Sequence, residues 1–365
     1  MTLQNYWWLL FWPLIIGILS LLINMQHDET INGRQRAVWK PLFAIALVLP
    51  FVIWAGWRKG FGDTEQYRNT FFNLPSSFDQ IIPYLRGGVK GPGFRLFEIL
   101  FKCFFGNADV AFFTLVATIQ MVCVVYVYRK YSTDFWLSFF FFVASTDYLT
   151  WMHNGIRQFL AVAIIFLCVP LIAQKRYWLA IFLVLLAVPI HSSVWLFLPF
   201  IFIVNGKAWN FRTVFFILVI VLAVIFLDRV TGILTAAMEN TEYEGDIAYL
   251  EEDDGTNILR VLFYAVPTVM SLFFRSHIDS AEDPLINVCT NLSIVSTGFY
   301  VFSYFTSGIL MGSLPIYFSL ANYILLPWML KEVFEHRSGQ ILKGIFIAVY
   351  VVFFYYQCGI TWGLL

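Results

Sequence analysis

Residues 155–174 read GIRQFLAVAIIFLCVPLIAQ, and Arg157 is the only charged side chain in this run. An α-helix must present about 20 mostly apolar residues to cross the roughly 30 Å hydrocarbon core of a bilayer. The run meets that requirement. It therefore predicts a membrane-spanning helix that begins with an arginine.

The same pattern recurs along the whole chain. Hydrophobic residues make up 60% of the 365 residues and charged residues 13%, whereas soluble proteins average roughly 45–50% and about 25%. Further apolar runs occupy residues 6–24, 41–57, 108–128, 135–150, 177–190, 193–206, 212–228, 258–274, 285–304, 309–330 and 341–358. We predict an all-α polytopic membrane protein, a single transmembrane domain over residues 1–365 with about 12 (10–14) transmembrane helices. A turn at Pro189–Ser193 separates two of these helices; one long helix is the alternative.

Lys and Arg residues are divided unevenly between the two sets of connecting loops. One set holds 13 of the 23, nearly all in short loops, and the other holds ten, seven of them within residues 58–107. Because cytoplasmic loops carry an excess of Lys and Arg, we place the first set in the cytoplasm and both termini outside. The formal net charge of zero argues against a nucleic-acid-binding protein.

Two outside segments are long enough to form structure of their own. Residues 58–107 contain glycine-rich turn signals and a short amphipathic piece at Phe94–Phe101, which is too short to span and predicts an interfacial helix. Residues 229–257 form an acidic loop, for which a solvated loop is the simplest interpretation.

Arg157 is the leading candidate for chemistry. It falls in the first turn of its helix, where the positive end of the helix dipole disfavours a cation unless it serves an anion. Backbone N–H groups and a guanidinium converge there, as in anion sites. The alternative is an interfacial arginine that extends to the membrane surface. His153, four residues earlier, shares this face if the helix begins that soon, and Gln158 follows Arg157.

Two other ionisable residues lie at the outer ends of predicted spans. His191, in the turn between two apolar runs, is either a proton carrier or phosphate ligand, or a hydrogen-bonded turn residue. Arg260 enters its span from the acidic loop. It is either an anion ligand or the ion-pair partner of Asp253 or Asp254.

The sequence RKGFGDTEQYR at residues 58–68 opens the first outside segment. Its two glycines permit close backbone approach, and Asp63 suits the N-cap of a helix over Glu65–Phe72. The close spacing of Arg58, Asp63, Tyr67 and Arg68 would also suit binding of a hydroxylated, anionic ligand.

No motif for a metal, a nucleotide or a cofactor is present. The five cysteines lie in or beside apolar runs at irregular spacings, as small packing residues do. There is no Walker motif, no HExxH and no GxSxG. We therefore expect no metal, no cofactor and no disulfide.

With these residues in view, the chain resembles the EpsG family of bacterial polysaccharide polymerases, the Wzy-type enzymes of O-antigen and exopolysaccharide assembly. Four short stretches carry the resemblance in order along most of the chain: Gly62–Tyr67, Arg157–Ala161, Leu186–Ser193, and Pro315–Phe318 with Tyr323–Pro327. Family members often carry an arginine shortly before the last of these. This chain has Leu310–Leu314 there, and Arg260 is the candidate substitute.

The resemblance implies a glycosyltransferase of the bacterial inner membrane that acts at the periplasmic face. Its donor and acceptor would be undecaprenyl-diphosphate-linked oligosaccharides, and membrane lipids, a chain-length regulator and other assembly proteins are candidate partners. Catalytic roles are then expected for Arg157, His191 and Asp63, and binding roles for Arg58, Tyr67, His153, Gln158, Arg260 and Tyr317.

Two other classes remain open from the residues. A transporter or lipid flippase would place charges near the bilayer midplane and often show internal repeats, whereas here the selected residues gather at one face. An O-antigen ligase or another membrane transferase would share the same broad pattern. Gel analysis of surface polysaccharide separates these classes.

Overall fold

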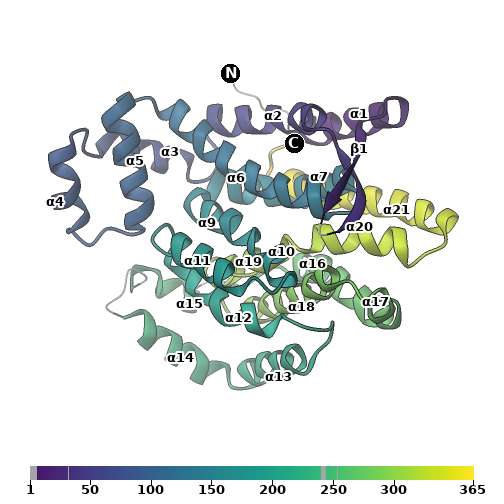
Figure 1. Ribbon diagram of the computed structural model, residues 1–365. Helices are drawn as coiled ribbons and strands as arrows, with labels where there is room; N and C mark the ends of the chain where they lie inside the picture. The colour runs from purple at the N-terminus through teal and green to yellow at the C-terminus, as the bar shows by residue number, and fades with distance from the viewer. Residues whose placement is uncertain (1–5, 32, 240–243, 253) are drawn as a thin grey trace. The chain divides into compact units, whose positions relative to one another are not determined.

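The computed structural model describes residues 6–31, 33–239, 244–252 and 254–365 (Figure 1). Within these ranges almost every element is a helix, and the backbone forms two compact units. Of the described residues, those within 1–164, 189–191 and 326–365 form the first unit, and those within 165–188 and 192–325 form the second. Each unit is described separately.

The first unit carries the outside segment and the leading candidate residues. Its helices and strands are α1 (Trp8–Leu22), β1 (Gln26–Ile31), β2 (Arg34–Trp39), α2 (Pro41–Trp57), α3 (Thr64–Asn73), η1 (Phe78–Gln80), α4 (Ile81–Leu85), α5 (Pro92–Phe105), α6 (Asp109–Tyr131), α7 (Phe135–Ala144), α8 (Asp147–Leu149), the π-helical turn η2 (Thr150–Asn154), most of α9 (Ile156–Phe166), the end of α20 (Asn322–Glu332), α21 (His336–Tyr355) and η6 (Tyr356–Thr361).

The second unit is built around a central helix, α18 (Pro284–Tyr304), against which α10 (Cys168–Ala173), α13 (Phe211–Ile225) and α16 (Ile258–Phe273) pack. Its other elements are α11 (Tyr177–Ala187), η3 (Ser192–Leu196), α12 (Phe197–Ile203), α14 (Leu227–Met238), η4 (Glu244–Asp246), α15 (Ala248–Glu252), α17 (Arg275–Ala281), η5 (Met311–Ser313) and α19 (Ile316–Ser319).

Local sequence signals explain several helix boundaries. The side chain of Asp134 accepts a hydrogen bond from the Leu137 backbone N–H at the start of α7, and Asn210 does the same for α13. Helix α6 has Asp109 in its first turn, and Arg129 and Lys130 in its last. These charges complement the helix dipole at both ends.

Each of the twelve predicted apolar runs contains helix, and α11 and η3 are separate, as the turn at Pro189–Ser193 predicts. By length and composition, four described helices can cross a membrane, or up to seven if each of three bent pairs is one span. Five shorter apolar helices account for the remaining runs. The protein is therefore a helical, multi-pass membrane protein, and the total of 12 spans stays a prediction.

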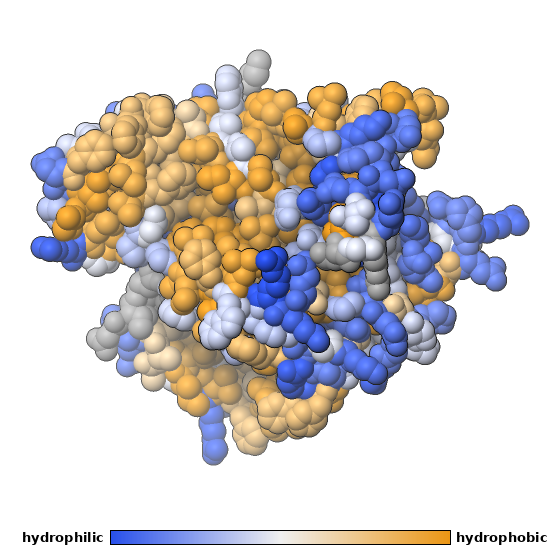
Figure 2. Space-filling view, viewed as in Figure 1, coloured by the Kyte–Doolittle hydropathy of each residue, from blue (hydrophilic) through white to orange (hydrophobic). Residues whose placement is uncertain are grey.

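The described chain is helical, as the all-α prediction expects, and it adds one short hairpin that the sequence did not indicate. Strands β1 and β2 pair as an antiparallel hairpin in which Gln26 faces Trp39 and Ile31 faces Arg34. The hairpin is fixed to α6, because Glu29 forms ion pairs with Arg129 and Lys130. Figure 2 shows hydrophilic side chains gathered over this hairpin.

The outer faces of many helices expose large apolar side chains. Trp178 is 85% exposed, Leu21 84% and Phe211 81%. Figure 2 shows hydrophobic side chains covering much of the visible face of α1, α5 and α6. Such exposure would be unfavourable in water over so large an area. Lipid is the natural environment of these surfaces.

Candidate active site

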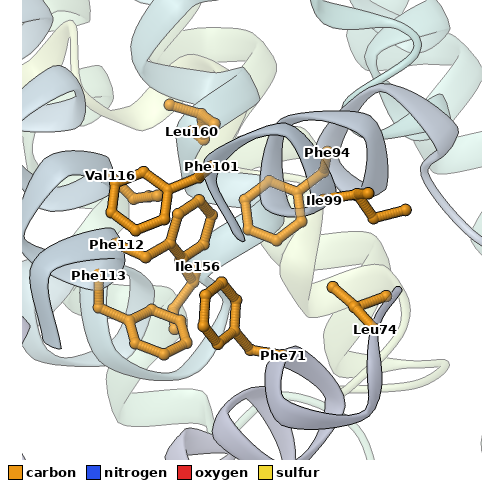
Figure 3. Packing of buried hydrophobic residues seen from close by; sticks show 10 residues of the cluster. All are labelled: Phe71, Leu74, Phe94, Ile99, Phe101, Phe112, Phe113, Val116, Ile156 and Leu160. Atoms are coloured by element: carbon orange, nitrogen blue, oxygen red, sulfur yellow. The ribbon is translucent and has the colours of Figure 1, made fainter. Parts of the chain in front are cut away.

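A buried aromatic cluster in the first unit supports the predicted site. Its members are Phe71, Leu74, Phe94, Ile99, Phe101, Phe112, Phe113, Val116, Ile156 and Leu160 (Figure 3). Ile156 directly precedes Arg157, and Phe94 directly precedes Arg95. Tyr67 and Ile190 pack against the same cluster. Side chains that lie far apart in sequence thus pack on one hydrophobic core.

Arg157 lies at the N-terminal end of α5. Gly91 is the N-cap of that helix and has a left-handed backbone with φ of 62°. A Cβ atom at Gly91 would lie 2.9 Å from Cδ and 3.0 Å from Nη1 of Arg157, and 2.7 Å from the carbonyl oxygen of Ile190. The backbone N–H of Gly93 donates to the Pro189 carbonyl over 2.8 Å. The start of α5, the Pro189–His191 turn and the first turn of α9 therefore meet at the Arg157 guanidinium.

Tyr67 contacts this junction from α3. Its pKa is raised by burial, an effect opposed by the Arg157 and Arg95 guanidiniums and by a hydrogen bond from the Arg157 backbone. The carboxylate of Asp63 acts in the other direction and raises that pKa. The Arg157 backbone N–H, in the first turn of α9, therefore points to the Tyr67 phenol oxygen, at a helix end that also favours anions.

His191 completes the part of the site that the sequence predicts. Its imidazole is partly buried, and its pKa is lowered to about 3 by desolvation, with further contributions from Arg157 and Lys90. The ring is therefore neutral at pH 7, so it can hydrogen-bond a phosphate or hydroxyl but adds no charge.

The structure adds Arg95 and Glu98 on α5, which sequence reasoning did not select. Nη1 of Arg95 lies 2.6 Å from Oε2 of Glu98, whose side chain is fully buried. Burial raises the pKa of Glu98 to about 7, against the opposing effects of Arg95 and Arg157. The sequence feature that could have indicated this pair is two opposite charges three residues apart, shortly after the Gly91–Gly93 turn.

Arg58 and Arg68 have partners within the protein. Arg58 is buried, its Nε donates to Thr64 Oγ1 over 3.0 Å and its Nη1 donates to the Ala55 carbonyl, and burial lowers its pKa to about 10. Arg68 pairs with Asp109. These contacts join α2 to α3 and α3 to α6, and the binding role of Arg58 stays a prediction.

Asp63 and His153 lie beside the site in different environments. Asp63 is the N-cap of α3, as predicted, yet its side chain makes no capping bond. Instead its backbone N–H donates to Oδ1 of Asn154 over 2.8 Å, and its side chain is exposed. His153 is fully buried, with its ring centroid 4.8 Å from that of Trp54 and 5.0 Å from that of Tyr148. Desolvation lowers its pKa well below the usual range.

Three candidates remain. Gln158 is buried on α9. In the second unit, Tyr317 hydrogen-bonds Ser193 across 2.7 Å, and the Arg260 guanidinium lies 5.8 Å from the centre of the Tyr264 ring. Asp253, one proposed partner of Arg260, lies outside the described residues.

All five cysteines are free thiols, and three of them are buried. Over residues 6–31, 33–239, 244–252 and 254–365, no group of three or more His, Cys, Asp or Glu side chains is arranged to hold a metal ion.

Apolar helices and a group of polar side chains around Arg157 in the first unit define a multi-pass membrane protein with a polar site. Its sequence matches the EpsG family over residues 42–359. The chain therefore belongs to the EpsG family, whose members are Wzy-type, exopolysaccharide polymerase-like proteins. No curated protein and no solved structure matches the chain.

Proposed function

We propose that this protein is a membrane glycosyltransferase that polymerises undecaprenyl-diphosphate-linked oligosaccharides at the periplasmic face of the bacterial inner membrane. The carrying observation is the position of Arg157, whose guanidinium meets the N-terminal ends of α5 and α9. Helix N-termini and guanidiniums both favour phosphate oxygens. The family supports the broader class, a polysaccharide polymerase-like membrane protein.

The proposed reaction transfers the growing chain from its lipid diphosphate to a hydroxyl of a new lipid-linked repeat unit. The acceptor oxygen bonds to C1 of the donor sugar, the bond from C1 to the diphosphate oxygen breaks, and the diphosphate leaves with the electron pair. Arg157 stabilises the negative charge that develops on the leaving group. Arg95 and Lys90 add positive charge around Tyr67 and His191.

The hydroxyl proton needs an acceptor. In this proposal Asp63 is the group that takes it, because its exposed carboxylate lies close enough to Tyr67 to affect that phenol's ionisation. His191, neutral and adjacent to Arg157, orients the hydroxyl or a phosphate oxygen. Lipid-linked donor and acceptor, bilayer lipids and a chain-length regulator are the partners of this scheme.

The test is complementation of a deletion strain, with surface polysaccharide separated on gels. We expect Arg157→Ala to abolish the polymer ladder at normal protein level and insertion. Arg157→Lys is also expected to be impaired, because lysine provides a point charge without the bidentate geometry. Arg86→Ala is the matched control, since Arg86 is an exposed arginine at the end of α4 in the same segment.

The deletion strain also distinguishes the competing classes. One repeat unit on the lipid core indicates a lost polymerase, whereas none indicates a lost ligase or flippase. A normal ladder in the Arg157→Ala strain would exclude Arg157 from catalysis.

A further inference from the structure

We propose that Glu98 is the internal counter-ion of the diphosphate site: it holds the Arg95 and Arg157 side chains while the site is empty, and it takes up a proton when a diphosphate binds. This inference rests on the proposed function, because it requires that the site beside Arg157 accepts a diphosphate.

The first observation is the geometry of α5. Gly91, Arg95 and Glu98 are spaced by four and three residues, so they share one face of the helix. Gly91 contacts Arg157, and Arg95 pairs with Glu98 at 2.6 Å. One helical face therefore carries the contact with the anion-binding arginine, a second arginine and a carboxylate.

The second observation is the incomplete pairing of the carboxylate. Oε2 of Glu98 pairs with Arg95, but Oε1 has no protein hydrogen-bond donor in the part of the chain that the structure describes, and the side chain is fully buried. A buried carboxylate oxygen without a donor favours the protonated form of the acid. The nearby guanidiniums favour the ionised form, but burial outweighs them and raises the pKa of Glu98 to about 7.

The third observation concerns the charges that face this group. Arg95 on α5 and Arg157 on α9 act on Glu98 directly. Around them lie Tyr67 on α3, and His191 and Lys90 on the adjoining turns. Lys102, one turn further along α5, donates instead to carbonyl oxygens at the end of α3. Asp63, which also acts on Tyr67, is exposed, so Glu98 is the buried carboxylate among the groups named here that offsets the charge of Arg95 and Arg157.

A bound diphosphate changes this balance. It takes the two guanidiniums as its own partners and adds negative charge near Glu98, so both effects favour protonation of the carboxyl group. Proton uptake therefore accompanies binding, and loss of that proton weakens binding and assists release of the lipid diphosphate product. By linkage, affinity falls as pH rises through about 7, by up to about tenfold per pH unit.

The test is calorimetric titration of the full chain in detergent with geranyl diphosphate, a water-soluble prenyl diphosphate that is fully ionised at pH 8. Repeating the titration in two buffers of different ionisation enthalpy gives the number of protons taken up. We expect a value approaching one for the unaltered protein and near zero for Glu98→Gln. Glu98→Asp, which keeps a carboxyl group, is expected to restore part of the uptake.

The Glu98→Gln variant also has an expected gain that misfolding cannot produce. It is expected to bind geranyl diphosphate about tenfold more tightly than the unaltered protein at pH 8 and equally at pH 6, because the amide resembles the protonated acid at every pH. Asp79→Asn is the matched control: Asp79 is exposed in the same outside segment, and its replacement is expected to leave affinity and proton uptake unchanged.

The outcomes separate the two proposals. Binding that depends on Arg157 but takes up no proton at pH 8 would overturn the role of Glu98 alone. Weaker binding by Glu98→Gln at pH 8 would do the same. Failure of the unaltered protein to bind any diphosphate would instead count against the proposed function itself.

Discussion

At the scale of single residues, the contact between Gly91 and Arg157 yields a sharp prediction. A Cβ atom at Gly91 would lie within 3.0 Å of Arg157 and of the Ile190 carbonyl. Gly91→Ala is therefore expected to displace the guanidinium and shorten or abolish the polymer ladder.

Gly88→Ala is the control for this prediction. Gly88 also has a positive φ, of 74°, but a Cβ there would meet nothing within 4 Å. Both variants place a Cβ atom on a backbone with positive φ, at a cost of about 1–2 kcal/mol, and only the first is expected to move Arg157. Equal ladders from the two strains would show that the contact with Arg157 is unimportant.

The sequence predicted individual site residues unevenly. Tyr67, Arg157 and His191 were selected from motifs, and the structure brings them together in the first unit. Arg95 and Glu98 were missed, because an Arg–Glu pair on an amphipathic helix usually indicates a solvated face. Their burial depends on the aromatic cluster beneath α5, which no local pattern reveals.

At the scale of elements, Lys102 joins α5 to α3. Its ammonium group donates to the carbonyl oxygens of Phe71, Phe72 and Leu74 over 2.7–3.0 Å, where α3 ends. Lys102→Met would leave these acceptors without their donor. We expect a loss of about 2–4 kcal/mol in the stability of this segment, measured as faster proteolytic cleavage between residues 74 and 92 in detergent.

Lys59→Met is the comparison for that variant, because Lys59 is exposed at the start of the same outside segment. The protease is expected to cleave this variant at the same rate as the unaltered protein. Equal cleavage of the two variants would mean that Lys102 does not hold the end of α3.

Helix positions were predicted well, and breaks between helices less well. Apolar runs indicate helices because a membrane-spanning helix is recognised from its length and its apolar composition alone. The hairpin of β1 and β2 was missed, since Gln26–Ile31 is mostly polar and its pairing partner is set by the turn and by contacts with α6. Helices α13 and α14 meet at 96° beside Phe226, and α16 and α17 at 71° beside Phe274; no Pro or Gly marks either bend.

At the scale of the whole molecule, α6 connects two polar regions of the first unit, one at each of its ends. Asp109 at its start pairs with Arg68 in the predicted outside segment, and Arg129 and Lys130 at its end pair with Glu29 of the predicted cytoplasmic hairpin. Its 23 residues extend about 34 Å at 1.5 Å each, close to the hydrocarbon thickness. The distribution of Lys and Arg supports the proposed orientation, with the candidate site on the outside.

That orientation is tested by labelling single cysteines in a chain whose five native cysteines are replaced. Ser76→Cys lies in the predicted outside segment and Ser280→Cys on α17, on the predicted cytoplasmic side; both serines are exposed. A membrane-impermeant maleimide is expected to label Ser76→Cys in whole cells with a permeabilised outer membrane, and Ser280→Cys only after lysis. The reverse pattern would place Arg157 and the α5 junction in the cytoplasm. A periplasmic polymerase could not then use that site, because its lipid-linked donor and acceptor would lie on the opposite side of the membrane.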